Sequence, residues 1–287
     1  MSGSAADLLA RCSFPAAGTT VDCAVSGGAD SLALLALAVQ AGCDVTAIHV
    51  DHGLRLGSAE EADVVAAVAI RLGARFRAVR VAVTEGANLE ARARRARYAA
   101  LPTDVLTGHT ADDQAETVLL NLLRGAALDG MAGYDPRRRP LRALRRRETH
   151  KLCADLGLQP VHDPSNDDPR FRRNRVRHEL LPLLDAIAER DIAVVLARQA
   201  EVLRADADLL DQLALAVDPA DARALAVAPL PLASRAVRRW LRAGAEQHPP
   251  DAATVARVLA VARGEAVACE VGGGRRVHRH EQRMVVG

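Results

Sequence analysis

The sequence predicts an α/β protein in which a parallel sheet carries helices on both faces, followed by a smaller, mainly helical domain. Strand-type and helix-type segments alternate from residue 21 to residue 124, which is the pattern of a parallel sheet with crossover helices. From Glu179 onward the chain reads mainly as helix. We therefore expect one domain over residues 1–184 and a second domain over residues 185–287.

Four short segments are the predicted strands, the first of them an apolar run, and a helix follows each of them. The strands cover residues 21–25, 45–49, 74–81 and 105–107. The helices cover residues 32–41, 58–72, 89–101 and 111–124, and Gly73 and Pro102 end two of them. Ligands bind beyond the carboxyl ends of the strands in such sheets, so the polar segments that follow the strands are the candidate site.

The rest of the chain is less regular. Residues 135–147 hold two prolines and seven arginines, and a helix is expected over residues 147–156. A turn at residues 163–166 precedes the mainly helical part, which reaches residue 216 and resumes around Trp240. Residues 266–286 look like short strands around three consecutive glycines. No apolar run is long enough to cross a membrane and no secretion signal is visible, so we expect a soluble cytoplasmic protein.

Charge and cysteine content narrow the function classes. The net charge is only +2, but Lys151 is the one lysine among 38 basic residues. Such arginine richness suits phosphate contacts on RNA, and it also suits the codon bias of a GC-rich genome. The five cysteines show no CxxC spacing, which favours buried, inert thiols in a reducing compartment. Aromatic residues make up only 2%, so the chain does not resemble a stacking platform for single strands.

The segment after the first strand has the chemistry of a phosphate-binding loop. It reads Ser26-Gly27-Gly28-Ala29-Asp30-Ser31 and opens a helix. Glycines allow a tight turn and a close approach to an anion, while free N–H groups at a helix start favour phosphate. Both serines can add hydroxyl donors, and Asp30 makes sense as a partner of Mg²⁺ bound to the nucleotide. The alternative is an ordinary glycine-rich turn with a helix cap.

A second polar segment opens the helix after the fourth strand. His109, Asp113 and Glu116 stand at i, i+4 and i+7, which predicts one helical face that could hold a cationic substrate or a metal. The alternative is that Thr110 caps the helix and the acids match its dipole. After the second strand, residues 49–55 read on their own as a polar strand end, and His52 and Arg55 are lower-ranked candidates for phosphate or tRNA contacts.

A third polar segment follows the turn at residues 163–166. Five arginines recur from Arg170 to Arg177, with Asn174 and His178 beside them. A run of charges is usually a solvated face, but arginines after a turn also suit the positioning of RNA phosphates.

Several of these motifs together resemble a known enzyme family. SGGADS resembles the SGGxDS loop of the N-type ATP pyrophosphatases (PP-loop, adenine nucleotide alpha hydrolase-like proteins), which cleave ATP at the α-phosphate. With HVDHGLR, NLEARARRARYAAL, TGHTADDQAETVLLNLLRG and DPSN…RNRVRHELLPLL, residues 21–184 resemble the tRNA(Ile)-lysidine synthetases. Longer members carry a further C-terminal domain, so we expect this chain to be a short form without it.

The resemblance implies a reaction, its substrates and the residues that serve it. ATP would adenylate the wobble cytidine of the tRNA(Ile) that has a CAU anticodon, and free L-lysine would then displace AMP to give lysidine. By position, Ser26 to Ser31 would bind ATP, with Asp30 as the partner of Mg²⁺. His109, Asp113 and Glu116 would hold or deprotonate lysine. The lower-ranked arginines for phosphate or tRNA contacts are Arg97, Arg124, Arg175 and Arg177.

Two alternatives accompany this hypothesis. One alternative is another adenylating tRNA enzyme of the 2-thiolation type, although paired cysteines are missing. The other is a non-catalytic RNA-binding protein that kept the fold. A homodimer is one option for the assembly.

Overall fold

The structure is a computed structural model that describes residues 5–51, 58–82, 89–161, 163–242 and 250–287. Contacts divide the chain into two compact units, Met1–Glu201 and Val202–Gly287, and the division falls within the long helix α10 (Ile192–Ala214). The expected domain boundary after residue 184 remains a prediction. None of the described helices is long and apolar enough to cross a membrane.

A four-stranded parallel sheet is the centre of the first unit. Its strands are β1 (Thr20–Ala24), β2 (Asp44–Asp51), β3 (Arg75–Arg80) and β4 (Leu106–Thr107), in the order β3-β2-β1-β4. Along the chain, β2 pairs with β1 and β3 pairs with β2 on one side of the sheet. The next strand, β4, then pairs with β1 on its other side. The topological switch point therefore lies between β1 and β4, which is where open α/β sheets bind their ligands.

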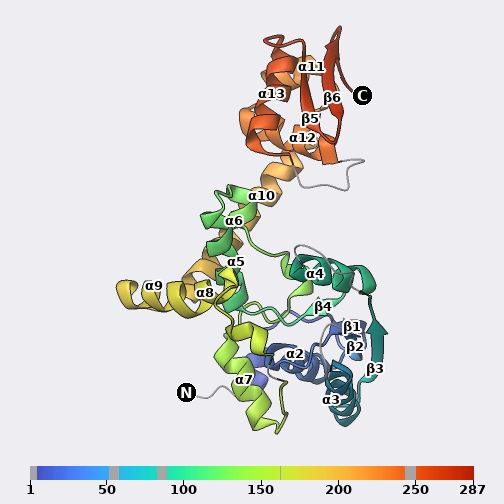
Figure 1. The fold of residues 1–287 in the computed structure, drawn as a ribbon, viewed down its shortest axis with the longest axis vertical. Coiled ribbons are helices and arrows are strands. Elements are labelled where there is room, and N and C mark those ends of the chain that lie inside the picture. Colours follow the sequence, from blue (N-terminus) through green and yellow to red (C-terminus); the bar gives the residue numbers. More distant parts are fainter. Residues whose placement is uncertain (1–4, 52–57, 83–88, 162, 243–249) are drawn as a thin grey trace. The chain divides into compact units, whose positions relative to one another are not determined.

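Helices cover both faces of this sheet, as the sequence predicted (Figure 1). Side chains alternate along a strand, so Val45 and Ala47 of β2 enter one core and Ile48 enters another. The larger core packs the sheet against α1 (Ala5–Leu9), α2 (Ala29–Gln40), α3 (Ser58–Arg71) and α7 (Arg146–Asp155). On the opposite face Leu101, which directly follows α4 (Leu89–Ala100), packs with Ile48.

The remaining elements of the first unit carry the polar segments of the sequence. After β4 come α5 (Ala111–Leu123), α6 (Leu128–Met131) and a 3₁₀ turn (Pro136–Arg138), and a second 3₁₀ turn (Pro164–Asp167) follows α7. The helix α8 (Arg172–Arg175) then runs through a π-helical segment, Val176–Leu180, into α9 (Leu181–Ala188). Apolar residues of α5 and of this helical run share a small core around Ala115 and Val176.

The second unit combines helices with a small sheet. The helices are the end of α10, α11 (Ala222–Val227), α12 (Leu230–Arg242) and α13 (Ala252–Arg263). The strands β5 (Ala268–Gly272), β6 (Arg275–His280) and β7 (Arg283–Val286) form an antiparallel sheet, which agrees with the strands expected around the three glycines. The sequence analysis did not predict α11 or α13, because prolines and alanines around them obscure the helical periodicity.

Candidate active site

Two loops meet at the switch point of the sheet. One follows β1 and contains Ser26 to Ser31, and the other follows β4 and begins at Gly108. A Cβ atom on Gly108 would lie only 2.5 Å from the carbonyl oxygen of Asp30 and 2.8 Å from its carbonyl carbon. Only glycine permits this approach of one backbone to the other. The glycine of the second motif therefore fixes the acidic helix α5 beside the first loop.

The first loop presents unused backbone donors at the start of α2. Gly27 has a φ of +89°, a conformation that glycine adopts without strain, and Gly28 is the N-cap residue. Among the described residues, the N–H groups of Gly27, Gly28, Ala29 and Asp30 donate to no protein acceptor. Such donors at a helix N-terminus form an anion site, because the helix dipole adds to their partial charge.

The two serines of the loop differ in availability. Ser31 is buried, its hydroxyl donates to the carbonyl oxygen of Gly28 at 2.8 Å, and it accepts from the N–H of Ser26 at 3.1 Å. Ser26 is exposed, with its hydroxyl 3.3 Å from that of Ser31. Ser31 thus stabilises the loop through internal hydrogen bonds, and Ser26 is the serine that is exposed to solvent.

Asp30 is a carboxylate in an unfavourable environment. Its side chain is 24% exposed and accepts hydrogen bonds from Thr149 and, at 3.4 Å, from Arg146. Burial and the negative charge of Asp113 raise the pKa of Asp30, although Thr149 and Arg146 oppose that shift. A carboxylate destabilised in this way could serve as a ligand for a divalent cation.

Asp113 caps the helix and also faces the arginines. Its Oδ2 atom accepts from the N–H and the hydroxyl of Thr110, each at 2.9 Å, so the helix capping given above as the alternative is present. Its Oδ1 atom accepts from Arg146 and Arg173, each at 3.0 Å. Burial raises the pKa of Asp113, but Arg146, His109, Arg173 and the N–H of Thr110 outweigh burial and hold that pKa well below its usual range.

Glu116 is fully buried and surrounded by guanidinium groups. Arg146 donates to Oε1 at 3.0 Å, and Arg173 donates to Oε2 at 2.6 Å. Arg177 donates to both oxygens, at 2.7 and 3.3 Å. Arg173 and Arg177 reach the same carboxylate because a spacing of four residues puts them on one face of the α8 and π-helical run.

Arg146 connects all three acidic residues. Its Nε, Nη1 and Nη2 atoms point to Asp30, Glu116 and Asp113, respectively. Burial lowers the pKa of Arg146, but these acids outweigh burial and raise it above its ordinary value. Its position is fixed through its neighbour Arg145, which forms a bidentate pair with Asp112 at 3.0 and 2.8 Å.

His109 lies in the loop before α5, not on the helical face that the sequence analysis predicted. The helix begins at Ala111, because Thr110 adopts an extended conformation and serves as its N-cap. The His109 ring contacts Thr107 at 2.8 Å and lies 4.9 Å from the ring of Tyr134, measured between ring centroids. Tyr134 also accepts a hydrogen bond from Arg173 at 3.2 Å, and the guanidinium of Arg139 lies 4.2 Å over its ring.

The lower-ranked candidates are scattered. Arg177 lies in the cluster around Glu116, whereas Arg175 forms an exposed pair with Glu179. Arg97 and Arg124 are exposed, on α4 and at the end of α5. His52 and Arg55 lie outside the described residues.

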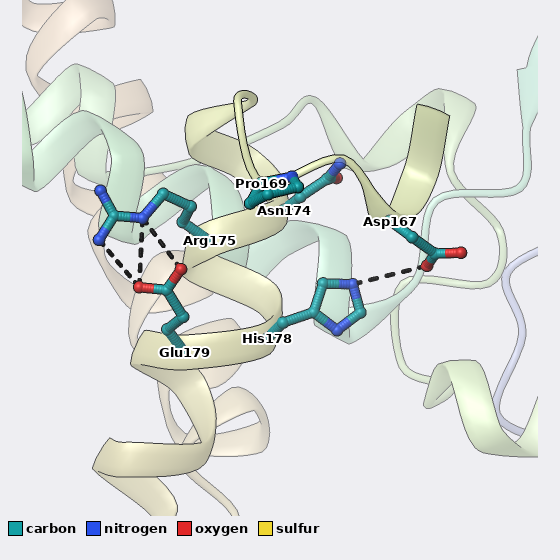
Figure 2. A pocket seen from close by; sticks show the side chains of 6 residues that line it. All are labelled: Asp167, Pro169, Asn174, Arg175, His178 and Glu179. Atoms are coloured by element: carbon teal, nitrogen blue, oxygen red, sulfur yellow. Dashed lines mark hydrogen bonds and ion pairs between the residues drawn. The ribbon is translucent and has the colours of Figure 1, made fainter. Parts of the chain in front are cut away.

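A shallow pocket of about 200 Å³ borders Arg175 (Figure 2). His178 and Asp167 face each other there at 4.0 Å. The acidic cluster is not part of the lining of this pocket. The lining residues are Asp167, Pro169, Asn174, Arg175, His178 and Glu179.

Sequence reasoning missed three contributors to the cluster. Arg146 sits in a run of three arginines, where nothing in the letters distinguishes it from its neighbours. Tyr134 and Thr149 lie in the irregular region and on α7, far in sequence from the motifs that they contact.

Comparison with known proteins places the chain in a family. Residues 5–184 match the family model described as a PP-loop domain. A protein of Nocardia farcinica named tRNA(Ile)-lysidine synthase is 48% identical over 255 residues, which cover 83% of this chain and 80% of that protein. A protein of Rhodococcus erythropolis with the same name is 48% identical over 238 residues, which cover 77% of this chain and 73% of that protein.

The fold also occurs in a solved structure, the U34-tRNA thiolase NcsA from Methanococcus maripaludis with its [4Fe-4S] cluster. The similarity has a TM-score of 0.55 at 17% sequence identity and covers 70% of this chain and 78% of that chain. At this identity the likeness concerns the fold alone.

Proposed function

This chain belongs to the tRNA(Ile)-lysidine synthase family, and from that premise we propose that it joins L-lysine to the wobble cytidine of the tRNA(Ile) with a CAU anticodon. ATP is consumed and lysidine, AMP and pyrophosphate are the products. The modified base pairs with adenine instead of guanine. The tRNA therefore reads the isoleucine codon instead of the methionine codon, and it is aminoacylated with isoleucine instead of methionine. This reaction takes place in the cytoplasm, where ATP, lysine and tRNA are available together.

The reaction consists of two substitutions. The C2 carbonyl oxygen of the cytidine attacks the α-phosphate of ATP, a P–O bond forms and pyrophosphate leaves. The neutral ε-amine of lysine then attacks C2, the C–O bond to AMP breaks, and the amine loses a proton. The first step needs donors for the phosphates, and the second needs a place for a cation that becomes a nucleophile.

One observation carries the proposal at the level of the site. The close approach at Gly108 puts a loop with four unused N–H donors next to two buried carboxylates on α5. An anion site beside an acidic pair matches a reaction that joins a phosphate-activated group to an amine. A protein that only bound RNA would have no need for carboxylates next to its phosphate donors.

Roles for individual residues follow from their environments. The N–H groups of Gly27 to Asp30 and the Ser26 hydroxyl would bind the phosphates of ATP. Asp30 would hold Mg²⁺ together with those phosphates, and the ion would supply positive charge at the α-phosphate. Asp113 and Glu116 would hold the ammonium group of lysine. Because its pKa is held low, Asp113 is suited to binding an ammonium group and poorly suited to removing a proton from it.

Tyr134 is our candidate for the residue that holds the extruded cytosine. Its ring is partly exposed and lies beside His109 at the edge of the carboxylate cluster. A base that has left its stack gains roughly 1–3 kcal/mol by stacking on an aromatic ring. The guanidinium of Arg139, now over that ring, would move to a phosphate of the anticodon loop.

The thiolation alternative fits the cysteines poorly. Sulfur transfer needs a thiolate, but burial raises the pKa of Cys12 to about 11, of Cys23 to about 12 and of Cys153 to about 11. Cys153 lies beside the start of α2, where its thiol donates to the carbonyl oxygen of Ala29 at 3.3 Å. All five cysteines are unpaired, and Cys12 and Cys269 are the two that are partly exposed.

The decisive experiment incubates the purified protein with ATP, Mg²⁺, lysine and the tRNA(Ile) with a CAU anticodon. We expect AMP and pyrophosphate to be released, and nucleoside mass spectrometry should detect lysidine in place of one cytidine. The same reaction without lysine, and with elongator tRNA(Met), serves as a control. Absence of a lysine-dependent product would refute the proposal, and a 2-thiolated product from a sulfur donor would favour the alternative.

A further inference from the structure

Both acids that would bind the amine are saturated with hydrogen bonds in this structure. An ionised carboxylate offers about four acceptor positions. Asp113 receives two N–H or O–H bonds from Thr110 and one each from Arg146 and Arg173. Glu116 receives one bond from Arg146, one from Arg173 and two from Arg177. An ammonium group can therefore bind these acids only after a guanidinium group has left.

The charges of the cluster point to the same conclusion. Asp30, Asp113 and Glu116 contribute three negative charges, and Arg146, Arg173 and Arg177 contribute three positive charges. The acids are compensated, so a further cation gains little by entering. An anion at the loop of α2 changes this balance, since it attracts one of the arginines and leaves the acids short of one positive charge.

Arg146 is the arginine best placed to respond. It is the one that contacts Asp30, through an Nε–Oδ2 distance of 3.4 Å, which is longer than its 3.0 Å contacts with Asp113 and Glu116. Asp30 is also the residue whose own N–H is among the unused donors of the anion site. Arg173 and Arg177 come from the α8 and π-helical run and make no contact with Asp30 among the described residues.

We propose that Arg146 is a built-in counter-ion that occupies the amine subsite until the nucleotide arrives. Phosphates at the α2 loop draw its guanidinium toward them, which vacates one acceptor position on Asp113 and one on Glu116. The ammonium group of lysine, with three N–H donors, takes both positions. Nucleotide and lysine therefore bind with positive coupling, and Arg146 is a positioning residue that acts through the two acids. The inference rests on the proposed function.

The test measures lysine binding without turnover. Isothermal titration calorimetry gives the Kd of L-lysine for the full chain, alone and with saturating α,β-methylene-ATP and Mg²⁺. We expect the nucleotide to tighten lysine binding at least tenfold, about 1.4 kcal/mol. Lysine should tighten nucleotide binding by the same factor, because coupling between two binding sites is reciprocal.

Two variants of Arg146 and one matched control variant test whether Arg146 produces the coupling between nucleotide binding and lysine binding. In Arg146→Gln, lysine should bind tighter than in the wild type without nucleotide, and the nucleotide should change its Kd by less than threefold. Arg146→Lys keeps the charge but cannot point three nitrogens at three acids, so its coupling should be intermediate. Arg147→Gln changes the next residue of α7, an exposed arginine 3.6 Å from Asp191, and should retain the full coupling.

The outcomes separate this inference from the proposed function. Equal lysine Kd values with and without nucleotide in the wild type, or full coupling in Arg146→Gln, would overturn the inference even if lysidine is formed. Failure to form lysidine would overturn the proposed function whatever the binding data show. Thermal unfolding checks that each variant is folded, and Arg146→Lys decides the matter if Arg146→Gln does not fold.

Discussion

Gly108→Ala tests whether the contact between the two loops holds the site together. The added methyl group would lie 2.5 Å from the carbonyl oxygen of Asp30 and 3.1 Å from the N–H nitrogen of Ser31. Ordinary contact needs about 3.5 Å, so the loops must separate by about 1 Å. Both contacting groups are backbone atoms, and no side chain can rotate away to relieve the clash.

Two magnitudes follow from that displacement. Forcing a methyl group into packed structure costs about 1–3 kcal/mol, which lowers the Tm by roughly 2–4 °C for each kcal/mol in a chain of this size. Misplacement of reacting groups by 1 Å costs on the order of 100-fold in rate. We therefore expect a folded protein with a modestly lower Tm and about 100-fold slower AMP release at saturating ATP, lysine and tRNA.

Gly18→Ala is the matched control. Gly18 has a φ of +82°, so alanine is strained there, but nothing lies within 4 Å of the added Cβ atom. Its position before β1, at the opposite end of that strand from Ser26, keeps the strain away from the site. The control should lose about 1 kcal/mol of stability and no activity. Full activity of Gly108→Ala, or an equal loss of activity in both variants, would refute the reasoning.

Three further predictions concern single side chains. The pKa of Asp30 is raised in the folded protein, so its ionised form destabilises the fold at pH values above its ordinary pKa of 3.8. Asp30→Asn should therefore keep or raise the Tm at pH 7 while turnover is lost. A large fall in the Tm would contradict this prediction. The pKa of Asp113 is shifted in the opposite direction, so its ionised form stabilises the fold above pH 3.8, and this stabilisation is lost as the pH falls through the depressed pKa. The difference in Tm between wild type and Asp113→Asn, measured from pH 7 to 2.5, should therefore become smaller below pH 3.8. Tyr134→Ala should raise the KM for tRNA about 10-fold or more and leave the Kd of ATP unchanged, whereas Tyr134→Phe should keep the KM for tRNA; equal KM values in all three proteins would exclude stacking.

The sheet and its ligand edge follow from local signals. Strand-type segments alternate with helices, and the loop of Ser26 to Ser31 is recognisable by its glycines, so the parallel sheet and the polar segments after its strands were predictable. The strand order β3-β2-β1-β4 depends on contacts between distant segments, and the sequence did not predict it. The first residue of α5 was harder to predict from the sequence. Spacing alone put His109 on the helix, but Thr110 at the N-cap and the side chain of Asp113 set the first helical residue at Ala111.

The arginine cluster could not be read from the sequence for a different reason. Its members come from α7, α8 and the π-helical segment, and other arginines stand close to them in the sequence. Of these other arginines, Arg147 and Arg175 are exposed, whereas Arg145 is largely buried in its pair with Asp112. Arg147 is 75% exposed by side chain, whereas Arg146 next to it is 20% exposed. Burial, not residue type, separates the functional arginine from its neighbour, and burial depends on how α7 packs on α2 and α5.

The choice of arginine in this cluster has a chemical consequence. A cation that neutralises Asp113 and Glu116 must share the site with an activated cytidine, and a lysine side chain there would carry the same amine as the substrate. Once deprotonated, such an amine could attack C2 and join the protein to the tRNA. A guanidinium group keeps its proton in proteins and its charge is delocalised, so it offers no comparable nucleophile. Its planar fork also reaches several carboxylates at once, as Arg146 does with three. Arginine thus compensates the acids without competing with the substrate in the chemical step.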